Sequence, residues 1–146
     1  MEHINQSVDM LKDIYQTASM GLKGSELLVN KTEDVQFFEK LNEYAASYND
    51  IKNEAATLLS DQGEIPQDGS TMDKAGLWMG VQLNTLKDKT SSHMAEMLIQ
   101  GSTMGIIESE KQKNRYPDAD KKCCKLEDQL LSLQRRQIDD MKEFLG

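Results

Sequence analysis

Residues 19–30 read SMGLKGSELLVN, and residues 103–114 read TMGIIESEKQKN. The likeness extends over a longer stretch when residue n is set beside residue n+84. The aligned identities are Met10/Met94, Gln16/Gln100, Met20/Met104, Gly21/Gly105, Ser25/Ser109, Glu26/Glu110 and Asn30/Asn114. Ile14/Leu98 and Leu22/Ile106 are conservative pairs in the same alignment. The chain therefore contains an internal repeat, which suggests that one structural unit occurs twice.

The composition indicates an all-α protein. Only two prolines occur, aromatic residues make up 5%, and leucine, methionine, glutamate, lysine and glutamine favour helices. No stretch alternates between apolar and polar residues as a half-buried strand would. Apolar residues instead recur three and four positions apart, which predicts helices over 4–29, from the low thirties to 61, over 91–115 and over 117–145.

The predicted inner faces of two of these helices follow from the same spacing. For the second helix the stripe is Phe38, Leu41, Ala45, Tyr48, Ile51, Ala55 and Leu58. For the last helix it is Leu126, Leu130, Leu133, Gln137, Met141 and Phe144. Asn30 or Thr32 is expected to cap the second helix, and Pro117 to stand in the first turn of the last.

Residues 62–90 join the two repeats. The stretch GEIPQDGST at 63–71 predicts a loop, with Gly63 just beyond the end of the preceding helix. Ser70 and Asp73 are spaced as in a capping box, and a short helix is expected over 71–87. We therefore expect the joining segment to carry a helix of its own.

These elements predict one domain over residues 1–146. Helix pair 4–61 and helix pair 91–145 would each be an antiparallel hairpin, and their apolar stripes would share one core. Residues 62–90 would form the crossover between the pairs. Because glycine weakens a helix interior, Gly21 and Gly105 require a reason of their own. We expect them to let the first and third long helices cross closely; the alternative is room for a ligand.

Charge and composition exclude several classes of function. The net charge is −8 and no basic stripe occurs, so binding to nucleic acid is not expected. No apolar run approaches the roughly 18 residues of a membrane span, and the first residues lack the features of a signal peptide. We expect a cytoplasmic protein with no membrane partner. Cys123 and Cys124 are adjacent, so we expect two reduced thiols, one inward and one outward.

Two similar helix pairs with a long crossover resemble the ferritin-like superfamily of four-helix bundles. Segment 62–88, with its GEIP turn and the helix around Trp78, also resembles a bacterial ferritin-like family of unknown function. The first half is somewhat similar to spore coat F-type proteins. The resemblance implies a bacterial protein with a ferritin-like fold.

Enzymes of that superfamily hold a dinuclear iron site with two Glu-x-x-His motifs, and this chain contains no such motif. By the resemblance, the ligand positions fall on Ala45 and Tyr48 in the first pair and on Leu130 and Leu133 in the second. We expect these positions to be core. Glu26 and Glu110 are equivalent in the repeat, but we expect them near the turns and solvated. No cofactor is therefore predicted.

The sequence favours a non-catalytic bundle that acts as an interaction, assembly or structural module. The alternative is a metal-binding or oxidoreductase protein with unusual ligands. In the crossover helix, one stripe is suited to lying on the bundle, namely Met72, Gly76, Met79, Leu83 and Leu86. Leu77, Trp78 and Val81 lie outside this stripe. These three residues either lie in a groove of the bundle or form the interface of a homodimer, with Trp78 as its anchor. An unknown protein partner is also possible.

Overall fold

A computed structural model of the protein describes residues 2–67 and 74–146. The helices are α1 (Glu2–Val29), α2 (Val35–Asp61), α3 (Lys74–Asn84), α4 (Ser91–Arg115) and α5 (Lys121–Met141), followed by a single 3₁₀ turn, η1 (Lys142–Phe144). No strand occurs in these two ranges, so the prediction of an all-α protein is confirmed.

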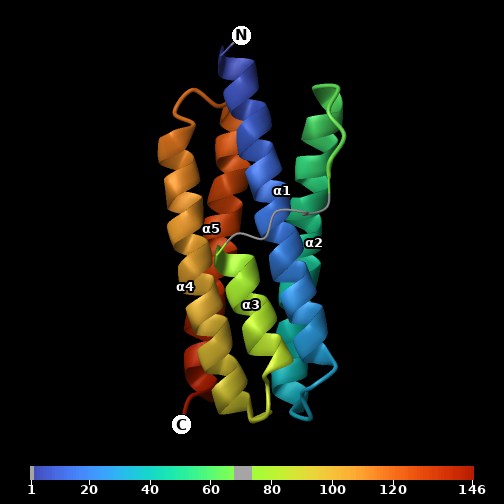
Figure 1. The fold of residues 1–146 in the computed structure, drawn as a ribbon, viewed down its shortest axis with the longest axis vertical. Helices are drawn as coiled ribbons and strands as arrows, with labels where there is room; N and C mark the ends of the chain where they lie inside the picture. The colour runs from blue at the N-terminus through green and yellow to red at the C-terminus, as the bar shows by residue number, and fades with distance from the viewer. Residues whose placement is uncertain (1, 68–73) are drawn as a thin grey trace.

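The four long helices lie side by side (Figure 1). α1 and α2 run antiparallel and pack against each other along their length, as do α4 and α5. α2 and α5 also contact each other, as do α1 and α4. The short helix α3 lies across the face formed by α1 and α4, near the end of the molecule that carries the C-terminus. α3 therefore contacts the bundle through α1 and α4.

The buried face of α2 differs by one residue from the sequence prediction at several positions. Its buried residues are Phe37, Leu41, Tyr44, Tyr48, Ile51, Ala55 and Leu59. Phe38 is 41% exposed, whereas Phe37 is fully buried and packs edge-on against Phe144 with ring centroids 5.1 Å apart. Tyr44, not Ala45, has the fully buried position, and Ala45 is half-buried. At Tyr44 and Ala45 the larger side chain faces the core, because it buries more apolar area. Phe37 and Phe38 are the same residue type, and the inward one is the one that packs against Phe144.

The predicted cap of α2 is wrong. Asp34 is the N-cap, and its side chain accepts hydrogen bonds from the backbone N–H groups of Gln36 and Phe37. Thr32 supports it, since the Thr32 hydroxyl accepts from the Asp34 N–H. The second Asp34 oxygen accepts a 2.7 Å hydrogen bond from the hydroxyl of Ser91, the first residue of α4. An aspartate satisfies this position better than asparagine or threonine because its two oxygens bond both helix starts.

The turn between α4 and α5 also differs from expectation. Pro117 lies in the turn, and α5 begins only at Lys121. Contacts with α1 hold the turn outside the helix. The Asp118 N–H donates to Gln6 Oε1 and the Asp120 N–H donates to Ser7 Oγ, both at 2.8 Å. These tertiary hydrogen bonds satisfy two backbone donors of the turn.

The crossover helix is shorter than predicted, ending at Asn84 instead of residue 87. Gly63 follows the C-cap Gln62 with a φ of 75°, as expected for a glycine beyond a helix end. The capping box at Ser70 and Asp73 lies outside the described residues. Leu83 and Leu86 are partly buried against the core, so the predicted inner stripe of this segment is confirmed at those two positions.

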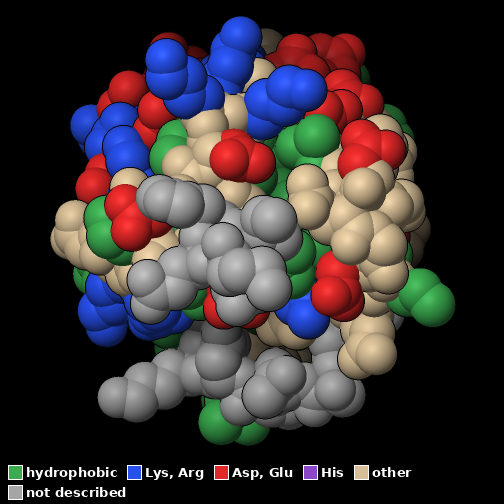
Figure 2. Space-filling view, turned by 90° about the horizontal axis from the view of Figure 1, so that it is seen from above, with side chains coloured by type: hydrophobic (Ala, Val, Ile, Leu, Met, Phe, Trp, Pro, Cys, Tyr) green, Lys and Arg blue, Asp and Glu red, His purple; other side chains and the backbone are tan. Residues whose placement is uncertain are grey.

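The surface mixes both signs of charge. Figure 2 shows the end of the bundle that carries the N-terminus, where lysine and arginine side chains lie among aspartate and glutamate side chains. Within residues 2–67 and 74–146, no helix is long and apolar enough to cross a membrane. Cys123 is buried and Cys124 is half-buried, and both are free thiols, in agreement with the sequence prediction.

Candidate functional site

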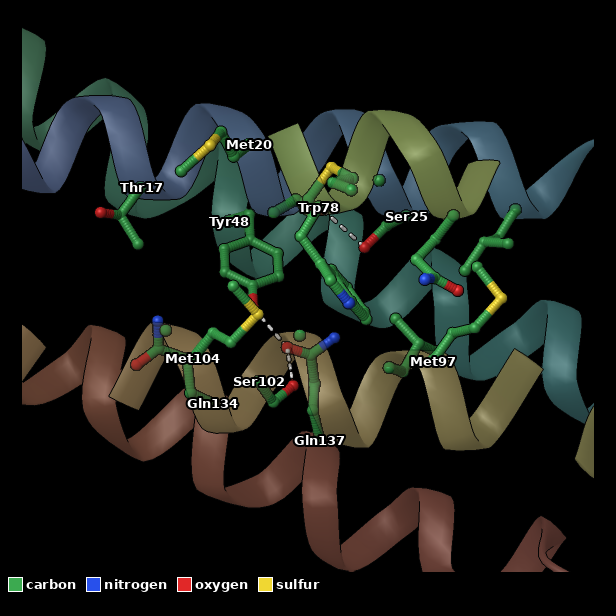
Figure 3. A pocket seen from close by; sticks show the side chains of 18 of the residues that line it. Thr17, Met20, Ser25, Tyr48, Trp78, Met97, Ser102, Met104, Gln134 and Gln137 are labelled. Carbon is green, nitrogen blue, oxygen red and sulfur yellow. Dashed lines mark hydrogen bonds between the residues drawn. The ribbon is translucent and has the colours of Figure 1, made fainter. Parts of the chain in front are cut away.

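A pocket of about 90 Å³ lies beneath α3, in the groove between α1 and α4 (Figure 3). Tyr48 reaches its floor from α2, and Gln134 and Gln137 reach it from α5. The polar residues that line it are Thr17, Ser25, Tyr48, Gln82, Ser102, Gln134 and Gln137. The remaining lining is glycine, leucine, the indole of Trp78 and four methionines, Met20, Met79, Met97 and Met104. The described lining therefore carries no formal charge.

Hydroxyl groups fix the two glutamines on the pocket floor. Tyr48 and Ser102 both donate to Gln137 Oε1, the latter at 3.2 Å. Ser109 donates to Gln134 Oε1 at 3.4 Å. Burial raises the pKa of the Tyr48 phenol well above its usual value, so this hydroxyl stays protonated and remains a donor. Three helices thus hold one Gln137 side chain in place.

Gly21 and Gly105 line this pocket, and their partners differ from those predicted. A Cβ at position 21 would first meet the ring of Tyr48, and a Cβ at position 105 would first meet the side chain of Gln134. Each glycine therefore admits a side chain from the other helix of its own pair. The nearest groups at both glycines therefore belong to the glycine's own helix pair, whereas the expected close crossing of the first and third long helices stays a prediction.

α3 covers the pocket with two large side chains. Trp78 lies over Gly101 of α4, and Met79 lies over Gly24 of α1; a Cβ at either glycine would meet them at 3.3 Å. Figure 3 shows the Trp78 indole pointing down between α1 and α4. Trp78 is half-buried here, whereas Leu77 and Val81 are 51% and 58% exposed. Of the two alternatives predicted for these three side chains, the groove describes Trp78 and does not describe Leu77 and Val81.

The positions that the resemblance assigns to metal ligands are mostly buried. Leu130 and Leu133 belong to the hydrophobic core, and Tyr48 is also buried, with its hydroxyl in the pocket floor. Ala45 is half-buried, because Tyr44 takes the inward position beside it. Among the described residues, no group of three or more His, Cys, Asp and Glu side chains is placed to hold a metal ion. Glu26 is exposed, and Glu110 lies 3.2 Å from Arg135 in an exposed ion pair.

Sequence reasoning missed one buried acid, Glu127 on α5. Its side chain is fully buried, and burial raises the pKa of the carboxyl to about 8, while the hydrogen bond between Glu127 and Ser109 acts in the opposite direction. With the Gln112 amide oriented so that its nitrogen faces Glu127, that nitrogen donates to the carboxyl group at 2.6 Å. Glu127 thus shares Ser109 with the pocket glutamine Gln134. The sequence signal that could have identified Glu127 as buried is its spacing from Gln134 and Met141, which lie on the same face of the helix.

A second acid, Asp13 of α1, lies outside the pocket lining, beside the C-terminal end of α4. It accepts a 2.8 Å hydrogen bond from the Tyr116 hydroxyl and lies 3.5 Å from Arg115. Burial raises the pKa of the Asp13 carboxyl, and the contacts with Tyr116 and Arg115 partly offset this effect. These bonds join α1 to the end of α4. Asp13 is therefore occupied in holding the helix pairs together.

No protein-family model, characterised protein or solved structure was found to match the chain. The resemblance to the ferritin-like superfamily therefore stays a prediction. What can be argued about function rests on the pocket itself. Its groups are hydroxyls, amides, thioethers and one indole, which bind and orient neutral molecules.

Proposed function

We propose that this chain is a ferritin-like bundle of two repeated helix pairs that acts as a non-catalytic binding protein for a small neutral molecule. The pocket beneath α3 would be its binding site. This proposal gives the interaction module expected from the sequence a specific partner class. A bacterial, cytoplasmic setting and the absence of a cofactor remain parts of the same proposal.

The observation that carries the proposal is the uncharged lining of the pocket. A buried ion without an opposite charge costs far more free energy than a neutral group does. The described lining offers no carboxylate, histidine or thiolate to a metal ion and no cation to an anion. The four methionine side chains adapt their shape readily, which suits an apolar surface of variable outline. A neutral, largely apolar molecule is the class that this lining favours.

Binding can be tested with benzene, using the methyl signals of ¹³C-methyl methionine. We expect benzene to shift the signals of Met20, Met79, Met97 and Met104, which line the pocket, and to leave that of Met10 unchanged. Met10 is fully buried but outside the lining. The fluorescence of Trp78, the single tryptophan of the chain, gives a second readout.

Two matched substitutions locate the site. Thr17→Phe should fill the pocket and abolish these shifts, because Thr17 lines it. Thr103→Phe, on the exposed face of α4, should leave them unchanged. If neither benzene nor its uncharged derivatives shift any of the four pocket methionines, the proposal is overturned.

A second candidate is association through the outer face of α3. Leu77 and Val81 stand one helical turn apart, and both are largely exposed. Such a pair suits contact with a second copy of the chain or with another protein. Sedimentation velocity of the wild type and of Leu77→Glu tests the homodimer. A wild-type protein that is monomeric at tens of micromolar would remove the homodimer and leave only a different protein partner.

A further inference from the structure

We infer that the molecule bound in this pocket carries a carbonyl or similar hydrogen-bond acceptor on an otherwise apolar body. This inference rests on the proposed function and adds the polarity of the recognised group. The inference follows from the hydrogen bonds that hydroxyl groups around the pocket donate to the side-chain oxygens of two glutamines.

Gln137 supplies the first part of the argument. An amide oxygen has two lone pairs, and Gln137 Oε1 accepts from two hydroxyls, those of Tyr48 and Ser102. The acceptor capacity of this amide is therefore used within the protein. Its nitrogen, which can only donate, lies on the side of the amide toward the Trp78 indole (Figure 3). A ligand beneath Trp78 thus meets a donor.

Gln134 repeats this arrangement toward the other end of the pocket. Its oxygen accepts from Ser109, and its nitrogen is the atom that lies nearest to the position of a Cβ on Gly105. Because glycine has no side chain, this amide nitrogen reaches the pocket wall at α4. Both glutamines therefore present donors on the floor, and a ligand with acceptor groups would complement them.

The rest of the pocket limits the other features of the ligand. Trp78 and the four methionines cover it with apolar surface, so the body of the ligand should be apolar. The volume of about 90 Å³ is smaller than the roughly 150 Å³ of an engineered cavity that binds benzene. A ring-sized ligand therefore requires a small outward shift of Trp78 or Met79. We expect one small ring or a short branched chain that bears one carbonyl.

Acetophenone labelled with ¹³C at its carbonyl tests the inference directly. A carbonyl that accepts hydrogen bonds resonates downfield of its position in cyclohexane. We expect the signal of bound acetophenone to lie downfield, and to move toward the cyclohexane value in Gln137→Met. Gln129→Met, on the exposed face of α5, is the matched control and should leave the signal unchanged.

A second measurement compares the affinities of two ligands of the same shape, so that the hydrophobic contribution to binding is the same for both. α-Methylstyrene has the shape of acetophenone but carries a CH₂ group instead of the oxygen. Gln137→Met should weaken acetophenone about tenfold, as expected for the loss of one buried hydrogen bond, and leave α-methylstyrene unchanged. If Gln137→Met does not fold, the carbonyl signal of the wild-type complex decides alone.

The outcomes separate this inference from the proposed function. A bound acetophenone with a cyclohexane-like carbonyl signal would overturn the inference, while benzene binding would still support the pocket. Binding of benzoate as tightly as acetophenone would instead overturn the neutral ligand of the proposed function, because the uncharged lining should exclude a carboxylate. If benzene, acetophenone and α-methylstyrene all fail to shift the pocket methionines, both proposals fall.

Discussion

The ring of Tyr48 lies in the space that a side chain at position 21 would occupy. A Cβ at Gly21 would fall less than 3.0 Å from three atoms of that ring. Tyr48 in turn is held by its hydrogen bond to Gln137, so the ring cannot move away freely. Tyr48 can therefore occupy its place in the pocket floor only because residue 21 has no side chain.

We expect Gly21→Ala to destabilise the protein. Overpacking costs about 1–3 kcal/mol, which exceeds the roughly 1 kcal/mol gained when alanine replaces glycine in a helix. Gly80→Ala in α3 is the matched control, since a Cβ there meets nothing within 4 Å. The midpoint of urea unfolding should fall for Gly21→Ala and stay equal or rise for Gly80→Ala. Equal midpoints would show that Tyr48 yields at little cost.

Gly105, which is equivalent to Gly21 in the repeat, should tolerate an added side chain better than Gly21 does. At Gly105 the clashing atoms belong to the flexible end of Gln134. We expect Gly105→Ala to cost less than Gly21→Ala in the same measurement, and Gly105→Leu to cost about 1–3 kcal/mol. An unchanged melting temperature for Gly105→Leu would indicate that the pocket accepts the added volume.

Glu127 should make stability decrease as pH rises. Burial raises the pKa of this carboxyl from 4.5 to about 8, with Asp13 and Asp128 acting in the same direction and Lys113 against it. The folded state therefore keeps a proton that the unfolded chain releases. Between about pH 4.5 and 8 the free energy of unfolding should fall by at most about 1.4 kcal/mol per pH unit, and then level off.

Glu127→Gln should remove most of that slope, because a neutral amide replaces the titrating group. Glu39→Gln, at an exposed site on α2, should leave the slope unchanged. A small slope should remain in Glu127→Gln from Asp13, whose pKa is also raised by burial. Urea unfolding at half-unit steps from pH 5 to 9 measures the difference. A wild-type stability that is flat over this range would contradict the assignment of Glu127 as a neutral acid.

Trp78→Ala should loosen α3 and lower the stability by about 1–3 kcal/mol, less than the usual loss for a fully buried aromatic residue. Leu77→Ala should have a small effect, because Leu77 is largely exposed. Hydrogen exchange of the α3 amides should accelerate only in Trp78→Ala. Equal acceleration in both variants would show that the indole does not hold α3 on the bundle.

The protein should bind no iron tightly and have no ferroxidase activity. Leu130 and Leu133 offer no ligand atoms, and the pocket floor at Tyr48 is neutral. Metal analysis of protein purified without a histidine tag measures this directly. One or two tightly bound irons per chain would favour the alternative of a metal-binding protein with unusual ligands.

The sequence predicted the helices well and the positions of individual side chains less well. The bounds 91–115 of α4 agree with its periodicity, and the end of α2 at Asp61 agrees with the glycine that follows. Periodicity alone does not distinguish Tyr44 from Ala45 or Phe37 from Phe38, because adjacent residues differ by only about 100° around the helix. The packing of the aromatic rings against α5 and η1 decides between them.

The pocket was harder to predict than the helices, for a different reason. Gln134 and Glu127 are polar residues on a buried face, and the hydrophobic pattern that locates a core does not include them. The periodicity of the crossover helix places Trp78 with Leu77 and Val81, because all three lie outside its inner stripe. Its inward position depends on the absence of a side chain at Gly101, which lies 23 positions further along the chain.

The carboxylate of Asp34 has a consequence for how the two helix pairs are aligned. One oxygen caps α2 and the other accepts from Ser91 at the first residue of α4. If one pair slid along the other by a single helical turn, about 5.4 Å, these bonds could not form together. Asp34 therefore sets the register between the two pairs. Because opposite walls of the pocket come from different pairs, this one side chain also helps to keep those walls facing each other.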